Sequence, residues 1–95
     1  MDVTTKRLIG ENTCSMYKQA CESADLLNDA EMIEFVREDV TDSISFCGRK
    51  TGADVSGLLA AVNDAATIPA MYAALESAGC SPVQWCDTYG YSLAA

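Results

Sequence analysis

The sequence contains no histidine, and this absence removes several kinds of chemistry at once. Ser-His-Asp and Cys-His catalysis, imidazole metal ligands and histidine-based pH switches all require that side chain. A glycine-rich phosphate loop is missing too, because the nearest string, residues 48–52, lacks the upstream glycine spacing of a P-loop. We therefore expect no enzymatic activity, no metal site and no cofactor.

Basic residues are scarce: six Lys and Arg stand against fourteen Asp and Glu, for a formal net charge of −8. This balance argues against direct nucleic-acid binding, which needs a basic footprint. No apolar run approaches the roughly 20 residues that cross a membrane. Residues 1–10 offer only Leu8 and Ile9 as an apolar core, so they do not resemble a secretory signal. We expect a cytoplasmic protein without membrane contact.

Five cysteines are many for such a chain, and they fit no metal-binding pattern. There is no C-x2-C pair, and the closest spacings are six and seven residues. In a reducing cytosol we expect free thiols that behave as small buried hydrophobic groups. One or two structural disulfides in a secreted protein remain the alternative. The residues are Cys14, Cys21, Cys47, Cys80 and Cys86.

The length of 95 residues and the 49% apolar content are those of one small globular domain. Apolar residues recur with helical period almost throughout, which predicts an all-α single-domain bundle of four to five short helices over residues 13–95. We treat residues 1–12 as an N-terminal arm or part of a leading helix.

The second expected helix runs over about residues 30–47 and ends at Gly48, because glycine accepts the positive φ of a helix C-terminus. Thr67 and the pair Ser81–Pro82 mark later helix starts. The buried face of this second helix is expected to contain Met32, Phe35, Val36, Val40, Ile44 and Cys47.

Acidic residues follow one face of this second helix. Glu31, Glu34, Glu38 and Asp42 occupy positions i, i+3, i+7 and i+11. Neighbours at such spacing lie about 5–6 Å apart, roughly like phosphates along a nucleic-acid strand. The row therefore suggests a surface that mimics nucleic acid and fills a basic groove on a partner protein. A plain solvated helix face is the other interpretation.

The second half of the chain differs in composition, since no Lys or Arg follows Lys50 and alanine is abundant. Such a half suits either a homodimer or partner contact, or a tight internal bundle. Trp85 and Tyr89 are candidate interface anchors near the C-terminus, although such clusters also close cores. Residues 74–85 resemble the turn of a helix-turn-helix motif, but the following residues carry no basic group for phosphates.

Together these features predict a small, non-enzymatic protein-binding module, a stoichiometric inhibitor or adaptor that binds a partner with a basic surface. Small acidic phage and mobile-element proteins, anti-CRISPR proteins among them, have this profile of size and charge. The candidate contact residues are Glu31, Glu34, Glu38, Asp42, Trp85 and Tyr89. Two alternatives stay open: a secreted, disulfide-stapled helical ligand or lipid-binding protein, and a helix-turn-helix-shaped dimerising regulator without DNA affinity.

Overall fold

The computed structural model describes residues 1–86, 91 and 93, and every regular element in this part of the chain is helical. This confirms the predicted all-α fold. The elements in chain order are α1 (Val3–Asn12), α2 (Cys14–Glu22), the single 3-10 turn η1 (Ala24–Leu26), α3 (Ala30–Thr51), α4 (Ser56–Asp64), α5 (Ile68–Ser77) and α6 (Pro82–Trp85).

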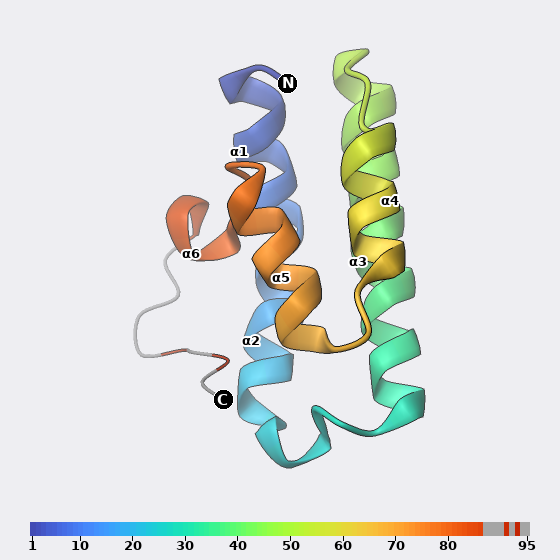
Figure 1. Cartoon of the computed structure of the whole chain (residues 1–95). Coiled ribbons are helices and arrows are strands. Elements are labelled where there is room, and N and C mark those ends of the chain that lie inside the picture. The colour runs from blue at the N-terminus through green and yellow to red at the C-terminus, as the bar shows by residue number, and fades with distance from the viewer. Residues whose placement is uncertain (87–90, 92, 94–95) are drawn as a thin grey trace.

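Residues 3–12 form helix α1, which packs into the core, so of the two expectations for this segment the structure has the leading helix and not the arm. The side chain of Asp2 caps α1 by accepting a hydrogen bond from the Thr5 backbone N–H at 2.8 Å. Ile9 is fully buried. At Thr13, where α1 ends, the buried hydroxyl and the backbone N–H both donate to the carbonyl of Ile9, at 2.9 Å and 3.0 Å. α1 and α2 are separated by Thr13 alone, and they lie end to end (Figure 1).

Helix α3 is the longest element, with 22 residues, and it passes four residues beyond the predicted end. The side chain of Asp29 caps its start by accepting from the Met32 backbone N–H at 3.0 Å. Its C-cap is Gly52, at φ 74°, and not Gly48. Gly48 lies inside the helix, and a Cβ there would stand 2.7 Å from a methyl group of Val55. The missing side chain thus allows the segment leading into α4 to approach α3 closely.

Helices α4, α5 and α6 complete the bundle. α5 starts at the predicted Thr67 cap, whose hydroxyl accepts from the Ala70 backbone N–H, and α6 starts at the predicted Ser81 cap. Figure 1 shows α4 in front of α3 and α5 in front of α2, with α6 beside α1. α6 is a single turn of four residues, and therefore far shorter than a helix that reads a DNA groove.

The core lies between these helices and contains Val36, Val40, Ile44 and Cys47 of the predicted α3 stripe, while Met32 packs against it half-buried. Phe35, predicted to be buried, is 57% exposed. Successive residues of an α-helix are rotated by about 100°, and Phe35 precedes Val36 on the side away from the rest of the stripe. The fully buried apolar side chains of the whole core are Ile9, Ala20, Val36, Val40, Ile44, Cys47, Val62, Ile68, Met71, Leu75 and Cys80.

Candidate interaction surface on helix α3

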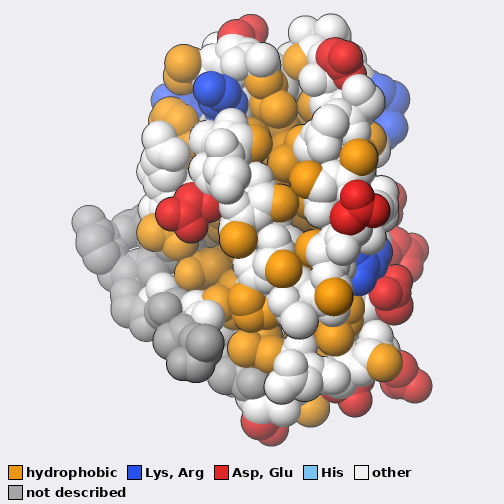
Figure 2. Space-filling view, in the orientation of Figure 1, with side chains coloured by type: hydrophobic (Ala, Val, Ile, Leu, Met, Phe, Trp, Pro, Cys, Tyr) orange, Lys and Arg blue, Asp and Glu red, His pale blue; other side chains and the backbone are white. Residues whose placement is uncertain are grey.

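The four acidic residues predicted as contacts lie together on the exposed side of α3. Glu31, Glu34, Glu38 and Asp42 are all exposed, while Val36, Val40 and Ile44 turn the opposite side of the helix into the core. We call these four residues the acidic face. In Figure 2 acidic side chains gather along the right edge and the bottom, where Figure 1 places α3 and the connection that leads into it.

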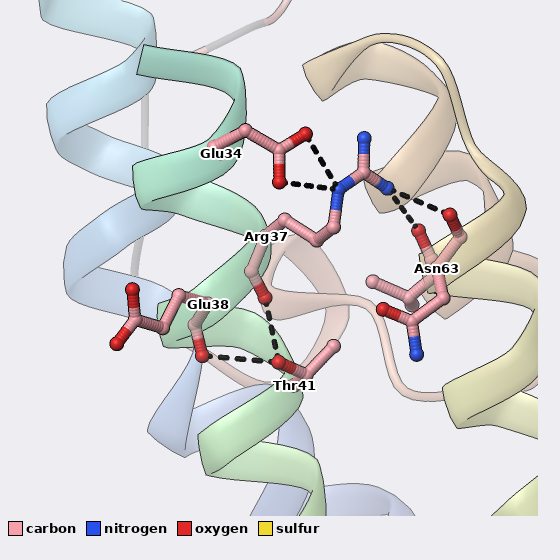
Figure 3. Close-up of polar contacts among 6 residues, drawn as sticks. Glu34, Arg37, Glu38, Thr41 and Asn63 are labelled. Atoms are coloured by element: carbon pink, nitrogen blue, oxygen red, sulfur yellow. Dashed lines mark hydrogen bonds and ion pairs between the residues drawn. The ribbon is translucent and has the colours of Figure 1, made fainter. Parts of the chain in front are cut away.

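The one basic residue near the acidic face is engaged inside the fold. Residues 22–42 contain eight acidic residues and a single basic one, Arg37. Its side chain is only 16% exposed, and its Nη1 donates to the backbone carbonyls of Val62 at 2.8 Å and Asn63 at 3.0 Å (Figure 3). These carbonyls belong to the last turn of α4, where a positive charge is favourable. Arg37 therefore joins α3 to α4.

Arg37 divides the acidic face into one paired carboxylate and three others. Its Nε lies 3.2 Å from the carboxylate of Glu34. The side chain of Glu38 points away from Arg37 in Figure 3, and only its backbone carbonyl accepts from Thr41, at 3.1 Å. Over the described ranges 1–86, 91 and 93, the only other ion pair joins Arg7 to Glu11. The acidic face thus keeps most of its negative charge.

Asp39 lies beside the acidic face in a drier position. Its side chain is half-buried, unlike the exposed acidic residues around it. Burial and the nearby charge of Asp42 raise the pKa of Asp39 above the ordinary value of 3.8. Negative charges on this part of α3 therefore repel one another, and a cationic partner would reduce that repulsion.

Two aromatic side chains that the sequence analysis did not place on the surface border the acidic face. Phe35 is 57% and Phe46 is 47% exposed. They are eleven residues apart, so they lie on nearly the same side of α3, about 16 Å from each other along its axis. Lys50 places its Nζ 5.7 Å from the centre of the Phe46 ring. Phe35 instead has acidic neighbours, so the two aromatic sites differ in charge.

Phe35 forms one wall of an open hollow of about 400 Å³ between η1 and the first two turns of α3. Leu26, itself 45% exposed, lies on the η1 side. Carboxylates and apolar groups share this lining. We call this feature the Phe35 hollow; its residues are Leu26, Asp29, Glu31, Met32 and Phe35.

The predicted aromatic anchor Trp85 does not join the acidic face. Trp85 is half-buried, and its Nε1 donates to the carbonyl of Gly79 at 2.9 Å. Its ring packs on Gly10, where an added Cβ would stand 2.6 Å from the Trp85 Cδ1. Trp85 therefore joins α6 to α1, and Figure 1 shows α6 and α3 on opposite sides of the molecule. Tyr89 lies outside the described residues.

Four of the five thiols have raised pKa values and are therefore not activated. Cys47 and Cys80 are buried, and the other three cysteines are half-buried. Burial raises the pKa values of Cys21, Cys47 and Cys80, and burial together with contact with Cys14 raises the pKa of Cys86 to about 12. A protonated thiol is a poor nucleophile. No group of three His, Cys, Asp or Glu side chains suited to a metal ion occurs among the residues that the structure describes.

The alanine-rich second half places most of its small side chains outward. Leu58, Val62 and Leu75 are buried. Five alanines of the same helices and their connection are exposed: Ala60, Ala61, Ala66, Ala70 and Ala73. Figure 2 accordingly shows a broad surface of white and orange atoms with few charges over α4 and α5. Within the described ranges, no helix combines the length and the apolar character that crossing a membrane requires.

The chain matches no protein-family model, no curated protein and no solved structure. The most distinctive surface among the described residues is the acidic face of α3, bordered by exposed Phe35.

Proposed function

We propose that this chain is a small acidic protein without enzymatic activity that binds the basic surface of a partner protein through the acidic face of α3. One observation carries the proposal: four carboxylates lie exposed on one side of a helix, and only Glu34 among them has an ion-pair partner in the described structure. Such a protein acts as a stoichiometric inhibitor or adaptor in the cytoplasm.

The geometry of α3 supports a partner that handles nucleic acid. A helix of 22 residues is about 33 Å long, and its packed side holds the exposed side in place. Carboxylates at helical neighbour spacing, about 5–6 Å, approximate the phosphates that a basic groove accepts. Charge mimicry of this kind would suit an anti-defence protein of a phage or mobile element, such as an anti-CRISPR protein.

Affinity capture with a charge-reversed variant tests the proposal. Glu31→Lys combined with Glu38→Lys removes two carboxylates and leaves Glu34 with Arg37. The matched control, Asp64→Lys with Glu76→Lys, makes the same charge change on exposed residues of α4 and α5. We expect wild type and control to retain the same nucleic-acid-handling protein and to release it at moderate salt, because exposed charge contacts are screened over about 8–10 Å.

The charge-reversed α3 variant should retain none of that protein while its circular dichroism spectrum and melting temperature stay close to wild type. Equal capture by both double variants would contradict the proposal. Capture that survives high salt would also contradict the proposal, and it would indicate binding through the alanine-rich surface of α4 and α5.

A further inference from the structure

The Phe35 hollow is held open by backbone contacts that do not depend on a partner. The backbone N–H of Asp29 donates to the carbonyl of Leu26 at 2.9 Å, which closes the η1 turn. The Asp29 carboxylate then caps α3 on Met32, and its carbonyl accepts from Ile33 at 2.9 Å. Leu26 and Phe35, nine residues apart, are thereby held on the same hollow. A preformed apolar site avoids the cost of ordering on binding.

The lining of the hollow suits an apolar side chain, and its size leaves ample room for one. Its volume of about 400 Å³ is at the small end of binding pockets. Leu26 and Phe35 expose roughly half of their surfaces, and Met32, which also lines the hollow, is half-buried. Interface anchors of this kind, an apolar group in a pocket with a polar rim, account for much of the affinity of protein complexes.

The charges around the hollow select its occupant. Asp29 and Glu31 form the rim, and Glu38 continues the acidic face one turn beyond Phe35. A second copy of this chain would bring the same carboxylates against these, and an anionic membrane would be repelled in the same way. A cationic segment of a partner protein is the occupant whose charge is complementary.

On this basis, and resting on the proposed function above, we propose that the Phe35 hollow receives one apolar side chain from a cationic segment of the partner. The lysine or arginine residues of that segment contact Glu31, Glu38 and Asp42. Charge attraction then gives the encounter, and the apolar anchor fixes the register of the segment along α3.

A pair of matched peptides provides the probe. One is a fluorescein-labelled amphipathic peptide of leucine and lysine, about 15 residues long, near the lower limit for an isolated helix. The other has the same lysines and carries alanine in place of every leucine. Fluorescence anisotropy gives Kd for each peptide on the full chain. We expect wild type to bind the leucine peptide about tenfold more tightly than the alanine peptide.

Three variants separate the anchor from the charge. Phe35→Ser should weaken the leucine peptide about tenfold and remove the preference between the peptides. Phe46→Ser makes the same change three turns along α3, beside Lys50, and should leave the preference intact. Glu31→Gln with Glu38→Gln should weaken both peptides alike. Because Phe35 is 57% exposed, its variant should keep the wild-type circular dichroism spectrum and melting temperature.

The outcomes distinguish the two proposals. If Phe35→Ser binds the leucine peptide as tightly as wild type while the Glu31/Glu38 variant does not, the anchor is overturned and the acidic face stands. If the Glu31/Glu38 variant binds both peptides as tightly as wild type, the acidic face is overturned. If wild type binds neither peptide saturably, the proposal of an apolar anchor at Phe35 is also overturned.

Discussion

The two sides of helix α3 differ in both polarity and burial. On the inner side Val36, Val40 and Ile44 have no solvent exposure. On the outer side Glu31, Glu34, Glu38 and Asp42 are exposed, and the exposed Phe35 and Phe46 border them. The inner side stabilises the fold, and the outer side, by our proposal, binds the partner. By this proposal one helix serves both purposes, the fold on one side and binding on the other.

The strongest test of this contrast is a truncation on the inner side. Ile44→Ala removes fully buried methyl groups and leaves a cavity, which costs about 2–5 kcal/mol. Phe35→Ala on the outer side removes a larger side chain but should change stability by less than about 0.5 kcal/mol. Urea unfolding of both variants measures the difference. Equal losses would show that Phe35 contributes to the core.

A smaller effect is expected where α3 is tightest against its neighbour. Gly48→Ala places a Cβ 2.7 Å from a Val55 methyl, and overpacking of this kind costs about 1–3 kcal/mol. Gly57→Ala makes the same change in α4, where no atom lies within 4 Å. There the loss of glycine should stabilise the helix by about 0.5–1 kcal/mol. The melting temperatures should move in opposite directions; a rise in both would contradict the close packing at Gly48.

Arg37 lies between the two sides of α3, since it contacts both exposed Glu34 and the backbone of α4. Its substitution shows which of these contacts stabilises the fold. Arg37→Met keeps much of the apolar stem but loses the hydrogen bonds to Val62 and Asn63, so we expect a loss of about 1 kcal/mol. Glu34→Gln removes only the exposed half of the ion pair and should cost less than about 0.5 kcal/mol. Thermal unfolding of the two variants checks this order. If Glu34→Gln proved the more damaging, the ion pair and not the α4 contact would be the main role of Arg37.

The smallest effect concerns Asp39 at the edge of the acidic face. Its raised pKa means that the folded state holds this proton more tightly than the unfolded chain does. The stabilisation that comes from holding this proton is therefore fully present below pH 3.8, and it is lost as the pH rises through the pKa of Asp39 in the folded state. Asp39→Asn should stabilise the protein at neutral pH by about 0.2–0.5 kcal/mol, the size of one like-charge helix pair. This gain in stability over wild type should vanish below pH 3.8. A gain that does not depend on pH would contradict the raised pKa of Asp39.

Much of α3 could be predicted from the sequence, because helical period alone aligns Val36, Val40 and Ile44 on one side and the acidic residues on the other. The caps at Thr67 and Ser81 were predictable for a similar reason, since they depend on local hydrogen bonds. Phe35 was assigned to the core by its hydrophobicity, although its angular position already placed it outside the buried stripe.

Other features depend on contacts between distant parts of the chain, which no local pattern contains. From the local sequence Gly48 is predicted to end the helix, and only its contact with Val55 explains why a glycine lies there. The burial of Ile9 follows from the packing of α1 on α3 and α6. The Phe35 hollow needs the η1 turn to bring Leu26 beside α3, and the sequence gives no signal for that approach.

The central claim, that the outer side of α3 is the binding surface, is tested most directly by NMR. Backbone amide shifts of the isotope-labelled chain, recorded while the leucine and lysine peptide is added, report which residues meet it. The account predicts saturable shifts concentrated on residues 26–42, with the amides of α4, α5 and α6 largely unmoved. Shifts centred on the alanine-rich surface of α4 and α5, or on Trp85, would contradict it.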